Sequence, residues 1–242
     1  MKTNYLNDYG NEIENYFKNS LGSNLQKLEN FAKYVPRQIL TRFVAKYEIF
    51  KKVLNVQGSI VECGVHLGGG LMTFAQLSSI LEPVNFQRKI IGFDTFSGFT
   101  SISKEDSKGK STELKKGGLA VDSYDDLKKC VELFDSNRFI GHKEKVSLVK
   151  GDLKQTMPKY LEDNPHTIVS LLYLDLDVFE PTKVAIEQLI SRMPKGGVIV
   201  FDQLHSEFWP GETLAVLKTL GINNLRIQKL PFEPMISFAV IE

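Results

Sequence analysis

The sequence predicts an α/β fold with a mostly parallel sheet that is covered by helices on both faces. From residue 59 onward, short apolar runs such as "SIVECGV" and "SLLYLDLD" alternate with segments of helical spacing. Such near-continuous apolar runs are typical of buried parallel strands joined by crossover helices. Acidic residues and glycines also gather where the predicted strands end, which is where open α/β sheets bind ligands.

The expected elements follow from this periodicity. We expect strands at residues 59–65, 89–96, 145–152, 167–177, 196–203, 224–232 and 235–242, and helices at 69–81, 121–136, 153–163, 181–193 and 211–221. The last two strands are joined by only a few residues, which predicts antiparallel neighbours. The polar, aperiodic insert 97–118 is too long for an ordinary connection, so we expect a functional or mobile loop.

Residues 1–57 form a predicted helical extension ahead of a ligand-binding domain at 58–242. Pro36 suits a first helical turn and Gly58 a stop. Between them, apolar residues recur at helical spacing: Ile39, Leu40, Phe43, Val44, Tyr47, Phe50 and Leu54. Such a helix packs on the domain or on a second subunit, or serves as a lid over a ligand. We expect a homo-oligomer.

The composition is that of an ordinary globular protein, with 42% hydrophobic and 24% charged residues. A formal net charge of +1 gives no bulk electrostatic reason to expect a nucleic-acid or membrane-surface partner. No run approaches the roughly 18 apolar residues of a membrane span. Cys63 and Cys130 lie far apart and form no metal or redox pattern. We therefore expect a cytoplasmic protein with a small-molecule or glycan substrate.

An acidic residue stands near the end of each of the first five predicted strands. They are Glu62, Asp94, Asp152, Asp175 and Asp202. The turn after the first strand has the spacing E-x-G-x-x-x-G, which lacks the second glycine of the dinucleotide fingerprint. It suits a nucleoside without phosphates, since Glu62 can accept from an ammonium group and Asp94 from ribose hydroxyls. The alternative is a solvated strand end beside a tight turn.

The fourth and fifth strands indicate a cation. Asp175 and Asp202 end strands that are neighbours in the usual order, and converging carboxylates repel unless a cation lies between them. Hard oxygen ligands favour magnesium, and Asp175 could act as base, ligand or both. Asp177 is either a second ligand or a cap for the following helix.

Several blocks resemble the TylF-type (macrocin O-methyltransferase-like) family of S-adenosylmethionine-dependent sugar O-methyltransferases. They are "VECGVHLGG", "GFDTFSGF", "KGD", "LYLDLDVFEPTK", "PKGGVIVFD" and "FWPGE". The block "FDQLHSEFWPGE" resembles the calicheamicin-pathway branch of that family. The resemblance implies a class I (Rossmann-like) methyltransferase fold, with a seven-stranded sheet whose last strand is antiparallel.

The resemblance also implies a reaction and a set of site residues. A methyl group would pass to a sugar hydroxyl of a nucleotide sugar, natural product or surface glycan, with Mg²⁺ assisting. The implied cofactor-binding residues are Glu62, Gly64, Val65, His66, Gly68, Asp94, Thr95, Phe96, Asp152, Leu153 and Asp175. The implied catalytic aspartate is Asp175, and the metal ligands match Asp175, Asp202 and Gln203.

Gln203 departs from the Asp-Asp pair that the family commonly has at this point. Its amide oxygen can coordinate a hard cation but brings no charge. Weaker metal binding follows, or a site completed by Asp177, His205 or Glu207. A neutral His205 could also serve as the catalytic base. Phe208 and Trp209 offer flat surface for stacking on a sugar, or simply pack within their loop.

The sequence leaves two other classes of function open. An NAD-linked oxidoreductase is disfavoured because His66 stands where the second glycine of the fingerprint should be. A cofactor-binding protein without catalysis is suggested by Gln203, which spoils the metal pair.

Overall fold

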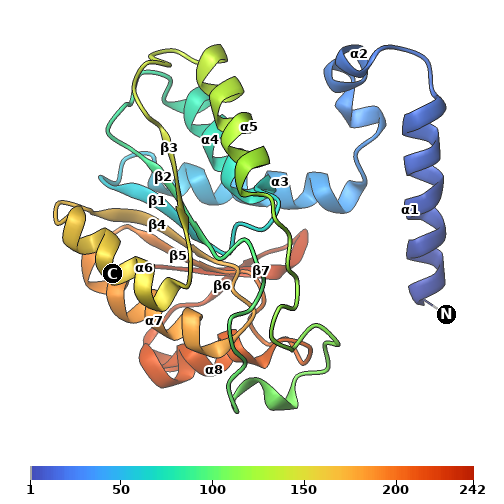
Figure 1. Cartoon of the computed structure of the whole chain (residues 1–242). Helices are drawn as coiled ribbons and strands as arrows, with labels where there is room; N and C mark the ends of the chain where they lie inside the picture. The colour runs from blue at the N-terminus through green and yellow to red at the C-terminus, as the bar shows by residue number, and fades with distance from the viewer. Residues whose placement is uncertain (1) are drawn as a thin grey trace. The chain divides into compact units, whose positions relative to one another are not determined.

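A computed structural model describes the backbone of residues 2–242 and the side chains of residues 8–242. The chain forms two compact units, residues 1–42 and 43–242. The boundary falls inside α3 (Arg37–Val53), so most of that helix belongs to the larger unit (Figure 1).

The smaller unit consists of α1 (Lys2–Asn19), α2 (Asn24–Glu29), a 3-10 turn η1 (Phe31–Lys33) and the start of α3. The start of α2 is fixed by a capping box, in which Ser23 and Gln26 satisfy each other's backbone N–H groups. Tyr34 packs edge-on against Phe17 at 5.2 Å. The helices predicted for this part of the sequence are therefore confirmed.

The larger unit is built on a seven-stranded sheet of order β3-β2-β1-β4-β5-β7-β6. The strands are β1 (Ser59–Cys63), β2 (Ile90–Asp94), β3 (Val146–Lys150), β4 (Val169–Leu174), β5 (Val198–Phe201), β6 (Gln228–Leu230) and β7 (Glu233–Val240). Strands β1 to β5 pair in parallel, and β7 is antiparallel to both β5 and β6. The predicted parallel sheet and its antiparallel closing pair are confirmed.

Helices cover both faces of the sheet, as Figure 1 shows. On one face lie α3, α4 (Gly69–Leu81) and α5 (Tyr124–Asn137), and on the other α6 (Leu153–Asp163), α7 (Phe179–Leu189) and α8 (Pro210–Thr219). Successive strand residues point to opposite faces, so Tyr173 joins the first core and Leu174 the second. Fully buried strands explain the continuous apolar runs in the sequence.

Several boundaries differ from those that the sequence predicts. Strand β4 ends at Leu174, so the predicted strand through residue 177 is too long. Asp177 instead has a left-handed φ of 62°. Helix α5 begins at Tyr124 with Ser123 in the N-cap position, three residues after the predicted start at residue 121. Both differences lie at element ends, where local turns and tertiary contacts override periodicity.

Arg88 joins several elements at the edge of the sheet where the parallel strands begin, opposite the edge that carries their carboxyl ends. The residue is 4% exposed, and its Nε pairs with Glu82 Oε1 at 2.8 Å. It also donates to the carbonyl oxygens of Val53 and Gly58 at 3.0 and 2.8 Å, and to the Ser170 hydroxyl. One guanidinium therefore joins the last turn of α3 to β1 and β4, because its planar fork can serve several acceptors at once.

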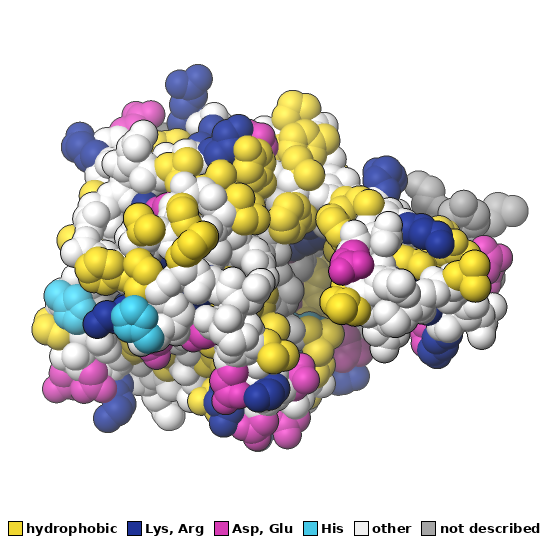
Figure 2. Space-filling model, turned by 90° about the horizontal axis from the view of Figure 1, so that it is seen from above, with side chains coloured by type: hydrophobic (Ala, Val, Ile, Leu, Met, Phe, Trp, Pro, Cys, Tyr) yellow, Lys and Arg dark blue, Asp and Glu magenta, His cyan; other side chains and the backbone are white. Residues whose placement is uncertain are grey.

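Exposed apolar side chains remain on the larger unit, as the view from above shows (Figure 2). They include Ile80, Val84, Phe86, Leu133 and Phe139, whose exposed fractions range from 52% to 72%. They belong to α4, α5 and the loops that follow these helices. Within residues 2–242, no helix combines the length and the apolar character needed to cross a membrane.

Replacing Arg88 should destabilise the larger unit strongly. We expect Arg88→Met to lower the free energy of unfolding by about 3–5 kcal/mol, because Glu82 and several carbonyls lose their buried partner. Urea denaturation measures the change. The control Lys129→Met removes a cation that is 68% exposed in its pair with Glu132, and should change stability by less than about 1 kcal/mol. Equal effects of both substitutions would contradict this role for Arg88.

Candidate functional site

The candidate site lies at the carboxyl edge of the parallel strands. There the end of β1 touches the chain that leaves β4: the Asp175 N–H donates to the Cys63 carbonyl at 2.8 Å. Gly64 has φ +92°, and a Cβ on it would lie 1.8 Å from the Asp175 carbonyl oxygen. Only glycine fits here, so the glycine predicted to contact the cofactor also brings Asp175 close to the glycine loop.

Asp94 organises two of the loops at this edge. Its Oδ2 accepts from the N–H groups of Val65 and His66 at 2.7 and 2.8 Å, and its Oδ1 accepts from Phe96 N–H at 2.7 Å. His66 and Phe96 both have positive φ, 52° and 53°. Hydrogen bonds to an ionised acceptor are strong, so one carboxylate holds two strained turns in place.

Several of the residues predicted to bind the cofactor have buried side chains. The side chains of Val65, Phe96 and Leu153 pack in the hydrophobic cores. Glu62 is buried, and a Cβ at Gly70 would lie 2.0 Å from its Oε1. The absence of a side chain at Gly70 thus leaves room for this carboxylate at the start of α4.

Three further predicted residues shape the turns around this loop. Asp152 caps α6 and accepts from the Thr100 hydroxyl of the insert at 2.8 Å. The Thr95 hydroxyl closes a turn by donating to the Gly98 carbonyl at 2.8 Å. Gly68 stands at the N-cap of α4 with φ 84°. Each of these positions therefore has a structural partner or a backbone role at this edge.

Asp202 is tied to a buried tyrosine and lysine. It is 3% exposed, and its Oδ1 accepts from the Tyr173 hydroxyl at 2.5 Å. The same hydroxyl accepts from Lys46 Nζ at 2.9 Å. Lys46 lies in α3 and is 4% exposed. The chain Lys46–Tyr173–Asp202 therefore brings a positive charge next to the predicted metal ligands.

The neighbouring carboxylates lie close enough to affect one another. Burial and the nearby charges of Asp202 and Asp177 raise the pKa of Asp175 well above its usual value, while Lys46 opposes this. Burial and Asp202 raise the pKa of Asp177 to about 7, although the Gln203 side chain donates to its Oδ1 at 2.6 Å. Carboxylates that share a dry site disfavour each other's charge, so this corner favours added positive charge or protons.

Glu212 belongs to the same corner and was not singled out by the sequence. It is fully buried in α8, and its Oε1 accepts from the Gln203 N–H at 2.9 Å. Burial, with Asp202 and Asp175 nearby, raises its pKa well above the usual value. The signal available in the sequence was the block "FWPGE", where an acidic residue follows a helix-starting Pro-Gly pair.

The insert 97–118 is anchored over this edge. Asp106, 1% exposed, accepts from the Phe179 N–H at 2.9 Å and so caps α7, and it also accepts from Ser103. Lys110 pairs with Glu207 at 2.6 Å, and Phe99 meets Trp209 edge-on at 5.9 Å. The sequence predicts a functional or a mobile loop for this insert, and these contacts favour an ordered loop.

Asp177 does not cap α7, because its Oδ1 accepts from the Gln203 side chain and the cap comes from Asp106.

His205 stands apart from the buried carboxylates. It is exposed, has φ 67°, and its backbone N–H donates to the Thr213 hydroxyl at 2.9 Å. Its predicted role as a base stays a prediction.

The residues predicted to hold a cation provide oxygen donors but do not form a complete metal site. Within the described residues, no three His, Cys, Asp or Glu side chains converge as metal ligands. Asp175 and Asp202 nevertheless offer hard oxygens, and the Gln203 Oε1 is buried without a hydrogen-bond partner. Magnesium is usually held by one or two carboxylates together with water and substrate. The donor set suits such a loosely held ion.

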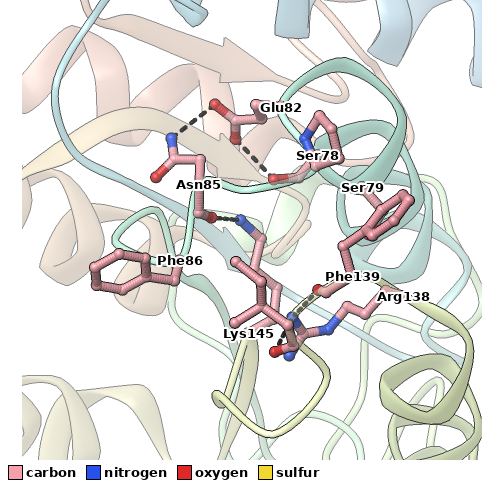
Figure 3. A pocket seen from close by; sticks show the side chains of 10 residues that line it. Ser78, Ser79, Glu82, Asn85, Phe86, Arg138, Phe139 and Lys145 are labelled. Carbon is pink, nitrogen blue, oxygen red and sulfur yellow. Dashed lines mark hydrogen bonds between the residues drawn. The ribbon is translucent and has the colours of Figure 1, made fainter.

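A small hollow lies at the opposite end of the sheet, between α4 and the loop before β3 (Figure 3). Lys145, whose pKa burial lowers to about 8, donates there to the Asn85 carbonyl at 2.6 Å. Glu82 accepts from Ser78 and Asn85. The hollow has space for about one water molecule, so we assign it no ligand.

Comparison with known proteins identifies the family of this chain. Residues 40–216 match the sequence profile of the macrocin O-methyltransferase (TylF) family. The chain belongs to this family. The crystal structure of CalS11, a calicheamicin methyltransferase, shares 33% identity and a TM-score of 0.91 over 95% of this chain and 90% of its own. No curated protein sequence gives a significant match.

Two other solved structures agree with this assignment. The apo structure of CalS11, described as a TDP-rhamnose 3'-O-methyltransferase, shares 32% identity and a TM-score of 0.82 over 95% of this chain and 92% of its own. The O-methyltransferase NovP, at 19% identity and a TM-score of 0.61 over 83% of this chain and 79% of its own, supports the fold. The chain is thus a class I methyltransferase in fold and an S-adenosylmethionine-dependent O-methyltransferase in activity. The matches give no support to an NAD-linked oxidoreductase or a non-catalytic binding protein.

Gly64 should tolerate no side chain. We expect Gly64→Ala to lower the free energy of unfolding by at least about 3 kcal/mol, because the new Cβ meets the Asp175 backbone at a left-handed φ. Gly69→Ala is the matched control, since a Cβ there meets nothing within 4 Å. It should leave stability unchanged or raise it slightly. Urea denaturation compares them, and a Gly64→Ala protein as stable as Gly69→Ala would contradict the close approach.

The raised pKa of Asp177 predicts a pH effect on stability. The folded protein keeps a proton on Asp177 up to a pH of about 7, whereas the unfolded chain releases it near the ordinary value of 3.8. Stability from this group is therefore full below pH 3.8 and is lost as pH rises to 7. Asp177→Asn should abolish this loss, worth up to about 4 kcal/mol. Unfolding in EDTA at several pH values measures it, and identical pH profiles of both proteins would refute the prediction.

Proposed function

We propose that this methyltransferase transfers the methyl group of S-adenosylmethionine to a hydroxyl of a sugar, with Asp175 as the catalytic base. The observation that carries the proposal is the close approach of Gly64 to the Asp175 backbone, because it brings the residue that we propose as the base next to the glycine loop before α4. CalS11, which is similar along almost the whole chain, is described as acting on TDP-rhamnose. A nucleotide-linked deoxysugar is therefore the acceptor class we propose.

In the proposed complex the cofactor lies over the turn from Gly64 to Gly68. Glu62, buried beside Gly70, would accept from the cofactor's ammonium group. The second lone pair of Asp94 Oδ1 is available to the ribose hydroxyls, since that oxygen accepts only one backbone N–H among the hydrogen bonds described. Asp152 and the backbone of Leu153 would lie beside the adenine.

Transfer is an in-line displacement in which the sugar oxygen attacks the methyl carbon. The C–O bond forms as the C–S bond breaks, the electron pair stays on sulfur, and S-adenosylhomocysteine leaves neutral. The hydroxyl proton passes to the Asp175 carboxylate. A carboxyl with a raised pKa is a better base than an ordinary aspartate, because proton transfer to it is less uphill.

A divalent cation would be held by Asp175, Asp202 and the amide oxygen of Gln203. When bound, such an ion lowers the pKa of a coordinated hydroxyl and offsets the charge of the carboxylates. Asp177 would orient the Gln203 amide oxygen toward the ion, because its Oδ1 accepts a hydrogen bond from Gln203 Nε2. Because Gln203 carries no charge, we expect weak binding that is readily reversed by EDTA.

The insert and the loop before α8 would contact the acceptor. Phe99 and Trp209 pack against each other between the insert and the loop before α8, and aromatic faces suit the apolar face of a sugar ring. The ion pair of Lys110 with Glu207 joins the same two segments, the insert and the loop before α8. This region is therefore proposed to set acceptor specificity.

An acceptor screen tests the proposed function. Purified protein is incubated with labelled S-adenosylmethionine and a panel of nucleotide sugars that includes TDP-rhamnose, with catechols as the competing acceptor class. We expect methyl transfer to a nucleotide sugar, reduced by EDTA and restored by Mg²⁺. Transfer to catechols but to no sugar would refute the acceptor class, and full activity in EDTA would refute the metal.

Replacing Asp175 tests the proposed base. Asp175→Asn should lower kcat by roughly 10²- to 10⁴-fold, because it removes the proton acceptor while keeping the shape of the side chain. Calorimetry should find unchanged affinity for S-adenosylhomocysteine. His205→Gln is the companion variant: a larger loss of kcat there than in Asp175→Asn would transfer the role of base to His205.

A further inference from the structure

We propose that Lys46 and Tyr173 are positioning residues for methyl transfer, acting through the carboxylate of Asp202. The inference rests on the proposed function, in which Asp202 helps to hold the cation that would bind the reacting hydroxyl. Lys46 lies 127 residues before Tyr173 in the chain, so only the folded structure brings these groups together.

The direction of each hydrogen bond is fixed by chemistry. An ammonium group can only donate, so the Tyr173 oxygen is the acceptor at 2.9 Å from Lys46 Nζ. A phenol has one hydrogen, and it goes to Asp202 Oδ1 at 2.5 Å. The positive charge polarises the phenol and strengthens its donation to the carboxylate. The three groups therefore form a relay of hydrogen bonds that holds Asp202 Oδ1 toward the Tyr173 hydroxyl.

The relay is enclosed on the face of the sheet that carries α3. Lys46 Nζ lies 4.1 Å from the centroid of the Tyr173 ring, and Phe74 packs edge-on against that ring at 5.6 Å. Tyr173 itself is fully buried in the strand. Because water is kept away from these hydrogen bonds, they are stronger than similar hydrogen bonds at the surface.

Fold stability alone does not account for a lysine at this place. The α3 residues that are buried with it are Ala45, Ile49, Phe50 and Val53, all of them apolar. Burying an ammonium group costs several kcal/mol of desolvation, and an apolar residue of the same volume often stabilises more. A cation placed among them is explained by the charge of Asp202 and Asp175, which it offsets.

The test compares wild type, Tyr173→Phe, Lys46→Met and the double variant, with the active acceptor from the screen and S-adenosylmethionine. We expect each single variant to lower kcat by roughly 10- to 100-fold with an unchanged KM for S-adenosylmethionine, since misplacement of a reacting group acts on the chemical step. The double variant should be no slower than the slower single variant. Lys51→Met, which removes an exposed lysine of the same helix, should behave as wild type.

Crystal structures of wild type and Tyr173→Phe give a reading that needs no acceptor. We expect the Asp202 carboxylate to leave its wild-type orientation while the sheet is unchanged. A wild type that methylates no sugar defeats the proposed function, and the orientation of Asp202 still decides this inference. An unmoved Asp202, a kcat within twofold of wild type in Tyr173→Phe, or multiplicative losses in the double variant would overturn it.

Discussion

The cost of gathering carboxylates away from water shapes the whole carboxyl edge of this sheet. Parallel strands must end at a common edge, and here each of β1 to β5 brings an acidic residue to it. Asp94 accepts hydrogen bonds from backbone N–H groups, and Asp202 accepts one from the Tyr173 hydroxyl, to which Lys46 donates in turn. Asp175 is left with a raised pKa beside the glycine loop. Hydrogen-bond donors therefore stabilise the carboxylates at some strand ends, whereas at Asp175 burial and neighbouring charges raise the pKa.

The insert 97–118 and the loop before α8 act as one layer over that edge. Asp106 ties the insert to the first turn of α7, immediately after the segment that carries Asp175 and Asp177. Lys218 of α8 binds Glu105 of the insert at 2.8 Å. A polar segment without periodicity is therefore held by a few buried or charged contacts instead of by a core of its own. The outer side chains of the insert take no part in these anchoring contacts, so they can change without loss of the anchor.

Periodicity and strand-end chemistry predicted the fold and the edge where the site lies, because both are local properties of the chain. The apolar runs gave the strands, and the short link before β7 gave its antiparallel direction. The strand through Asp177 was predicted too long, since alternation cannot reveal that Asp177 turns to φ 62°. Lys46 and Glu212 were missed as site residues because each is only a charged residue inside a helix until the helices are placed on the sheet.

The sequence by itself determined which residue types reach the carboxyl edge, the glycine turn that suits a nucleoside ligand, and the resemblance that family membership bears out. Only the tertiary structure decided how those groups share the site. The approach of Gly64 to Asp175, the capping of α7 by Asp106, and the relay from Lys46 to Asp202 each join segments far apart in the chain. Contacts of that kind depend on strand order and helix placement, which local patterns do not encode.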